Sequence, residues 1–155
     1  MKLKLITIGL LLSIVSLAAS SVMVNDAYLR ATPPNIPNSA AFMIVMNDTE
    51  EDLAIVGATS DIAIKVELHA HDMVNGMMRM HQVGKINLNA KSHVLFNPGG
   101  FHIMFLGLNK SLKEGDKVNF TLLLSNGKNI KITAPVKKVM AGIKDRKSDM
   151  HHGKM

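Results

Sequence analysis

The 155-residue chain contains no cysteine and no tryptophan, and its other aromatic residues are few, with one Tyr and five Phe. Without cysteine the chain has no disulfide, no thiolate metal site and no attachment point for a thioether-linked lipid. A blue-copper electron-transfer centre is excluded for the same reason, because its copper needs a thiolate ligand. The scarcity of aromatic rings also argues against a nucleic-acid interface, where bases stack on such rings.

The net charge of +6 is concentrated at the two ends of the chain. Lys2 and Lys4 lie at one end, and six basic residues against two acidic ones follow Val136 at the other. Residues 21–135 carry ten basic and ten acidic residues and are therefore neutral. A nucleic-acid-binding domain presents a basic face on its fold, so we exclude nucleic acid as a partner.

Composition divides the chain into three segments. Residues 1–20 have the pattern of a signal peptide, with an apolar run from Leu5 to Leu17 followed by small residues. The run is short for a membrane span, and a retained anchor is the alternative to cleavage. Residues 21–136 are long enough for one domain with its own core. Residues 137–155 are charged and polar, and we expect a flexible basic tail.

Short β-runs separated by turn residues fill the middle segment. Asn75-Gly76 and Asn126-Gly127 favour two-residue hairpin turns. This pattern predicts a single all-β domain, built as a sandwich or Greek-key barrel. The expected strands are Ala27–Arg30, Ala40–Asn47, Leu53–Ala58, Lys65–Met73, Met77–Val83, Ser92–Phe96, His102–Leu106, Lys117–Leu124 and Asn129–Ala134.

Methionine is abundant, with twelve in the chain, and seven Met or His residues fall between positions 69 and 81. A two-residue turn at Asn75-Gly76 would place His71 opposite Met80. Side chains alternate between faces along a strand, and two residues on one strand with one position between them share a face. Two groups result, one on the hairpin (His69, His71, Met73, Met78, Met80) and one on a later strand (His102, Met104).

The ligand types in these groups indicate a soft metal ion. Thioether sulfur has little affinity for hard cations and imidazole is borderline, so a His/Met set without cysteine favours Cu(I) over Zn, Ca or Mg. Methionine on a strand is also a common core filler. We expect Met43 and Met46 to be core residues, and His81 and His93 to be surface residues. Met73, Met77 and Met78 stay open between core and other uses.

One spacing decides between these alternatives. Ten residues separate His69 from Met80, twenty-one separate Met80 from His102, and His102-Ile103-Met104 completes the set. In this spacing the chain resembles the periplasmic copper chaperone family written PCu(A)C. The likeness extends from about residue 27 to residue 136, through Gly76-Met77-Met78-Arg79-Met80, Pro98-Gly99-Gly100-Phe101-His102-Ile103-Met104 and Leu112-Lys113-Glu114-Gly115-Asp116.

The resemblance implies a cupredoxin-like Greek-key β-sandwich that binds Cu(I) through His69, Met80, His102 and Met104. Some members have Met two residues after the first His, where this chain has His71, which makes His71 an additional candidate ligand. The family is linked to copper supply for the dinuclear copper centre of cytochrome c oxidase. We therefore expect an exported, periplasmic carrier whose partner is a copper acceptor, either an oxidase copper subunit or another copper chaperone.

Three other functions remain to be weighed. A copper buffer or resistance protein would use the same site without a dedicated acceptor, and a plain β-sandwich interaction module would bind no copper. An enzyme is disfavoured, because no catalytic triad, carboxylate pair or phosphate loop is evident; Glu67 beside His69 looks like a strand-surface residue. We expect no small-molecule substrate.

The C-terminal tail ends in a short His- and Met-containing sequence. Short His-rich tracts often bind metal, and adjacent imidazoles near backbone amides suit Cu(II). The tail is therefore either a solvated basic end or a weak second copper site, for which the candidate residues are Met150, His151, His152 and Met155.

Overall fold

The computed structural model describes residues 21–138, which form ten β-strands and no helix. The strands are β1 (Val22–Arg30), β2 (Asn38–Asn47), β3 (Leu53–Thr59), β4 (Ala63–Val74), β5 (Met77–Gln82), β6 (Ile86–Leu88), β7 (Ser92–Phe96), β8 (His102–Leu108), β9 (Lys117–Leu124) and β10 (Asn129–Lys137). The all-β expectation is thereby confirmed. The signal-like segment 1–20 and most of the expected tail, 139–155, lie outside the described residues.

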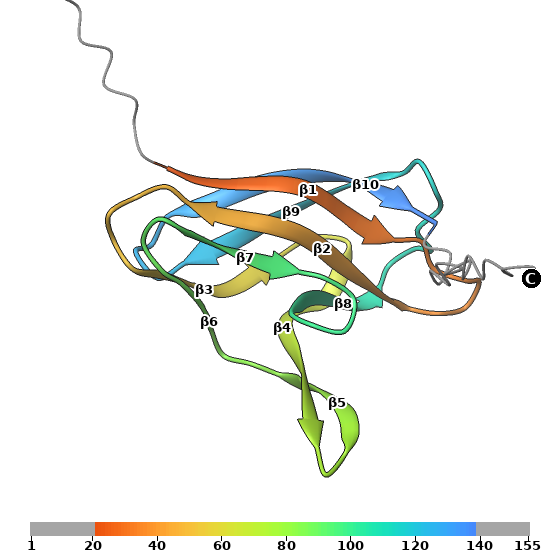
Figure 1. Ribbon diagram of the computed structural model, residues 1–155. Helices are drawn as coiled ribbons and strands as arrows, with labels where there is room; N and C mark the ends of the chain where they lie inside the picture. The colour runs from red at the N-terminus through yellow and green to blue at the C-terminus, as the bar shows by residue number, and fades with distance from the viewer. Residues whose placement is uncertain (1–20, 139–155) are drawn as a thin grey trace, which may run out of the picture.

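The strands follow the hydrogen-bonded order β5-β4-β8-β2-β1-β10-β9-β3-β6, with β7 also paired to β2. All pairs are antiparallel except β1 and β10, whose parallel pairing joins one half of the order to the other. The order curls so that its two halves face each other as a sandwich (Figure 1). The expected sandwich or Greek-key barrel is therefore the observed architecture.

The core lies between the two halves. Phe105 on β8 meets Phe120 on β9 edge to face, with ring centroids 5.6 Å apart, although the two strands are distant in the sheet order. Leu29, Val45 and Leu122 are fully buried beside them. Burying a side chain of this size contributes about 1.5–3 kcal/mol. This core holds the site-bearing strands β4 and β8 in place without any disulfide.

Nine of the ten strands were expected, with differences at their ends. The strand β6 was missed because three residues are too few to show a period. The strand β1 begins at Val22 rather than Ala27, because the chain passes through a left-handed residue, Asp26 (φ 53°), and a shift in register between Asn25 and Tyr28. Polar turn-forming residues at such an irregularity hide the strand from a pattern search.

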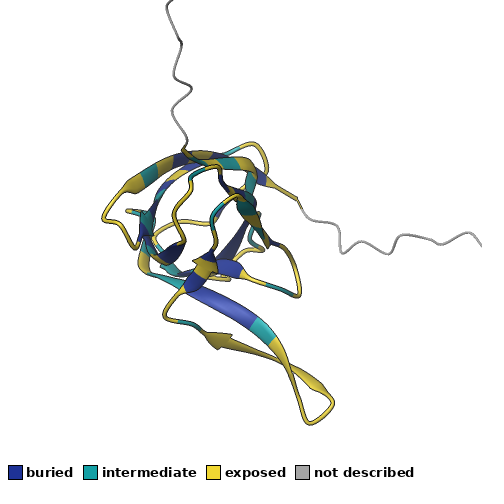
Figure 2. Cartoon of the chain, turned by 60° about the vertical axis from the view of Figure 1, so that its left-hand side comes forward, coloured by how far each residue is buried: buried dark blue, intermediate teal, exposed yellow. Residues whose placement is uncertain are grey.

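The hairpin of β4 and β5 projects away from the body of the sandwich (Figure 1). Its outer part is exposed on both faces, whereas the inner part of β4, at Leu68 and Ala70, is buried (Figure 2). Asn75 (φ 50°) and Gly76 (φ 76°) are both left-handed, which is the conformation of the tight turn that the Asn-Gly pair predicts.

Candidate copper site

Three neighbouring strands bring the candidate ligands together. In the β4–β5 pair His71 lies opposite Met80, as the turn predicts, and in the β4–β8 pair His69 lies opposite His102. Met104 follows two residues after His102 and therefore points to the same side of β8. The four residues of the spacing motif thus lie on one face of three neighbouring strands, at the base of the projecting hairpin.

The imidazole of His102 is held in one tautomer. Its side chain is buried, and its Nδ1 lies 3.0 Å from the carbonyl oxygen of Gly100. A carbonyl can only accept, so Nδ1 carries the hydrogen and Nε2 has a free electron pair. Burial is the largest influence on His102 and lowers its pKa, against the smaller opposing effect of the Gly100 hydrogen bond, so the ring is neutral at pH 7.

The free nitrogen of His102 faces a sulfur atom. Its Nε2 lies 3.1 Å from Sδ of Met80. In this tautomer both atoms are electron-pair donors, and neither offers the other a hydrogen. A soft cation placed against both atoms would use the two electron pairs at once, and a hard cation would gain little from the thioether.

Glu67 fixes the second imidazole, that of His69. The Oε2 atom of Glu67 accepts from Nε2 of His69 at 2.9 Å, which leaves Nδ1 with the free electron pair. That Nδ1 atom is buried and has no hydrogen-bond partner among residues 21–138. The His69 hydrogen bond, supported by Lys65, lowers the pKa of Glu67. A carboxylate that orients an imidazole in this way is a recurring partner of metal-binding His. We expected Glu67 to be a strand-surface residue; its side chain is instead largely buried and hydrogen-bonded to His69.

His71 lies in the same group. Its Nδ1 is 3.3 Å from the Gly100 carbonyl, and its ring centroid is 5.0 Å from that of His102, compared with 5.7 Å for His69. Gly100 can serve both imidazoles because a carbonyl oxygen has two acceptor positions. A Cβ at Gly100 would collide with the Asn97 side chain, so a glycine suits this turn.

The site opens to solvent through a shallow depression of about 380 Å³. Its walls contain His71, Met80, His102 and Met104, while His69 is not among the lining residues. In the described part of the chain, Arg30 is the one charged residue that lines it, and its guanidinium lies over the Phe42 ring, 5.4 Å from the centroid. The absence of carboxylates from this wall disfavours a hard divalent cation there.

Several other expectations can be compared with the structure. Met43 is buried in the core as expected, but Met46 is exposed, because side chains alternate along β2 and Met46 lies on the opposite face from Met43. Its sulfur accepts from the Asn25 amide at 3.1 Å. His81 and His93 are exposed as expected. Asp72 lies opposite Arg79 in the register, and its carboxylate is 3.4 Å from Nε2 of His81.

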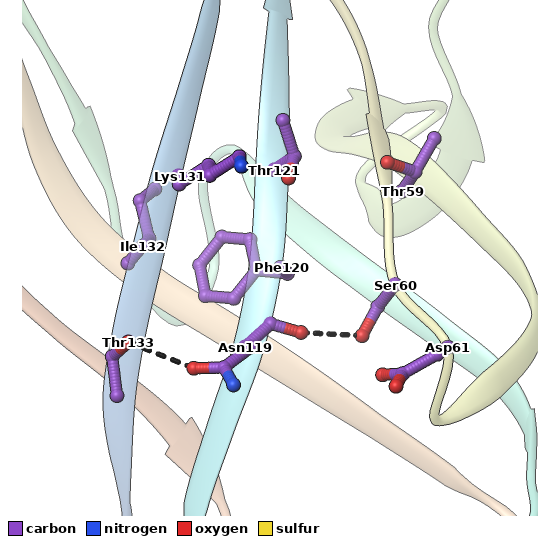
Figure 3. Close-up of a pocket in the computed structure, with 9 residues that line it drawn as sticks. All are labelled: Thr59, Ser60, Asp61, Asn119, Phe120, Thr121, Lys131, Ile132 and Thr133. Carbon is purple, nitrogen blue, oxygen red and sulfur yellow. Dashed lines mark hydrogen bonds between the residues drawn. The ribbon is translucent and has the colours of Figure 1, made fainter.

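A second depression lies on the opposite half of the sandwich, over β9, β10 and the end of β3 (Figure 3). Ser60 donates to the backbone carbonyl of Asn119 at 2.6 Å, and Thr133 donates to the Asn119 side chain at 2.7 Å. These polar groups are already paired with each other, and the lining residues include no His or Met. This depression therefore does not compete as a copper site.

Comparison with known proteins identifies the family. The family model LpqE-like, described as "Putative lipoprotein LpqE-like", matches residues 22–136. The chain belongs to this family. A curated relative from Leifsonia xyli subsp. xyli, named "Putative lipoprotein Lxx21020", is 34% identical over 120 residues, which cover 77% of this chain and 71% of that protein.

Solved structures agree with the fold and with the PCu(A)C resemblance. The copper-bound PCuAC domain from PmoF2 has a TM-score of 0.66 and 21% identity, covering 78% of this chain and 97% of that one. The Cu(I) form of DR1885 from Deinococcus radiodurans has a TM-score of 0.61 and 29% identity, covering 80% and 81%. The cupredoxin-like fold and the family resemblance are thereby confirmed.

Two observations concern the membrane. Among residues 21–138 no helix is long and apolar enough to cross a bilayer. The relative from Leifsonia xyli is named a lipoprotein, but this chain has no cysteine to carry a thioether-linked lipid.

Proposed function

We propose that this protein is an exported Cu(I) chaperone that binds one ion through His69, Met80, His102 and Met104 and passes it to an acceptor by ligand exchange. The contact between Nε2 of His102 and Sδ of Met80 is the observation that carries the proposal, because two electron-pair donors face each other at 3.1 Å. The presence of copper in a PCuAC domain and of Cu(I) in DR1885 supports the choice of metal.

His71 enters the proposal as an additional ligand. It lines the depression with Met80 and His102, whereas His69 lies behind the rim with its buried Nδ1 free. Either imidazole can complete the set formed by the other three side chains, and His71 is the one that solvent reaches more easily. A neutral set of this kind leaves the bound ion with a single positive charge, which suits release to a partner with stronger ligands.

An anaerobic titration of Cu(I) against a competing chelator tests binding. We expect one tight equivalent, with mixed sulfur and nitrogen coordination in X-ray absorption spectra. A protein that binds Zn more tightly than Cu(I) at this site would overturn the proposal. The plain interaction module predicts no tight equivalent at all.

Transfer separates a carrier from a copper buffer. The acceptor we propose is the copper domain of a cytochrome c oxidase subunit or a second copper chaperone. Mixing the Cu(I)-loaded protein with the apo acceptor should move the ion within minutes. If the protein binds Cu(I) but transfers it to neither acceptor, it is a copper buffer or resistance protein, which is the second candidate function.

The tail is proposed as a separate, weaker Cu(II) site at Met150, His151, His152 and Met155, which lie outside the described residues. Truncation after Lys138 is the matched test, because β10 extends to Lys137, which pairs with Arg30. We expect the truncated protein to keep its Cu(I) equivalent and to lose one Cu(II) equivalent. Unchanged Cu(II) binding would show that the tail is only a solvated basic end.

A further inference from the structure

The outer part of the β4–β5 hairpin exposes methionine side chains that the site does not use. Met73 is 65% exposed and Met78 is 53% exposed. A methionine that fills a core is buried, as Met43 is, so a core role is excluded for both. Figure 2 shows the outer hairpin as an exposed ribbon that stands away from the sandwich.

The strand register makes Met73 and Met78 a cross-strand pair. Met73 lies directly opposite Met78, and directly opposed residues have Cβ atoms about 4.5–5.5 Å apart. Two flexible thioether side chains at that separation can reach one ion. The left-handed conformations of Asn75 and Gly76 define a two-residue turn. This turn fixes the register of the hairpin, so Met73 and Met78 stay opposite each other.

The pair also continues the site. His71 and Met80 form the next pair along the same face of the hairpin, one same-face step of about 7 Å closer to the body. The charged pair of positions between them, Asp72 and Arg79, belongs to the opposite face. Soft ligands therefore run in two consecutive rungs from the projecting tip to the base of the hairpin.

We propose that Met73 and Met78 form a second, weaker Cu(I) site. An arriving ion would contact this site first and then pass to the tighter site at Met80 and His102, which is therefore the first to be filled at equilibrium. This inference rests on the proposed function. Each transfer exchanges one neutral ligand for another, so copper remains Cu(I) and no electron or proton moves. Two thioethers alone bind more weakly than the set of sulfur and nitrogen at the base, which gives the transfer its direction.

Silver(I) is a suitable probe, because it has the same charge and softness and does not change oxidation state. The full chain carrying ¹³C-methyl methionine is titrated with Ag(I), and the methionine methyl signals are followed by NMR. We expect the first equivalent to shift Met80 and Met104. The second equivalent should shift Met73 and Met78 and leave Met77, which is on the other face of the tip, in place.

Variants separate the chemistry of sulfur from the apolar surface. Met73→Leu with Met78→Leu keeps the apolar volume and removes both thioethers, and Met77→Leu is the matched control. The double variant should keep the affinity of the first equivalent within about twofold, and its Cu(I) uptake from a chelator should be at least fivefold slower. The control should match the unaltered chain.

The two levels of the proposal fail in different ways. Absence of a shift at Met80 and Met104 with the first equivalent would sink the proposed function. A normal first equivalent with no later shift at Met73 and Met78 would sink only the second site. Unchanged uptake in the double variant would overturn the transfer step, and would leave the tip as an apolar contact surface.

Discussion

Replacing Met80 and Met43 by alanine should separate copper binding from folding. The two substitutions remove the same atoms, but Met80 is 48% exposed at the site and Met43 is 2% exposed in the core. Burying a whole methionine is worth about 1.5–3 kcal/mol, so Met80→Ala should lower the free energy of unfolding of the apo-protein by about 1 kcal/mol. Met43→Ala also leaves a cavity and should lower it by about 2–5 kcal/mol.

The stabilisation gained from copper should rank the two variants in the opposite order. With free Cu(I) buffered at 100 times the wild-type Kd, binding stabilises the wild-type fold by about 2.7 kcal/mol. Loss of an orienting partner of a ligand typically weakens metal binding 10–100-fold, so loss of the ligand itself should weaken it at least about 100-fold. Copper would then stabilise Met80→Ala by only about 0.4 kcal/mol. Met43→Ala should keep the full 2.7 kcal/mol.

Thermal unfolding with and without buffered Cu(I) measures the difference. For a domain of roughly 120 residues, 2.7 kcal/mol corresponds to a rise in Tm of about 10 °C, and 0.4 kcal/mol to about 1–2 °C. The reasoning would be refuted by a folded Met80→Ala protein that keeps the whole rise. The reasoning would also be refuted if the copper-induced rise in Tm were reduced as much in Met43→Ala as in Met80→Ala.

Three further predictions concern the groups around the ligands. Glu67→Ala should weaken Cu(I) binding about 10–100-fold, because His69 loses the acceptor that fixes its tautomer, and Glu67→Gln should restore much of it; chelator competition measures both. Gly100→Ala should weaken binding by forcing the added Cβ against the Asn97 side chain, and Asn97→Ala in the same chain should restore it. Because burial lowers the pKa of His102, the unfolded chain takes up a proton near pH 6.5 that the folded one resists, so apo-protein stability should fall as pH drops below 6.5; denaturant titrations should show this trend, and His102→Gln should flatten it.

The sequence predicts the hairpin more accurately than the rest of the site. Asn75-Gly76 determines a two-residue turn, and the turn alone places His71 opposite Met80. Nothing local indicates that β8 lies beside β4, since that pairing depends on how the whole sandwich closes. The spacing motif supplied this information through the family resemblance, because a family spacing records which positions meet in the fold.

The role of Glu67 and the exposure of the tip were not predictable in the same way. A Glu two residues before a His on a strand shares its face, which is a usable signal, but solvent-facing pairs of this kind are common. The hydrogen bond becomes significant only because β8 buries His69 against His102. From the sequence, Met73 and Met78 could equally be core residues, because composition does not show that the hairpin extends beyond the sandwich.

The exposure of the ligands suggests an order for their release. His102 is 3% exposed and is anchored by the Gly100 carbonyl, whereas Met80 stands on β5, an exposed edge strand that is hydrogen-bonded to β4 in the described sheet order. In the proposed carrier, an incoming ligand from an acceptor would therefore displace Met80 first, while His102 still held the ion. In this proposal, a rigid imidazole on the body and a replaceable thioether on the projecting hairpin would together allow tight binding and stepwise exchange.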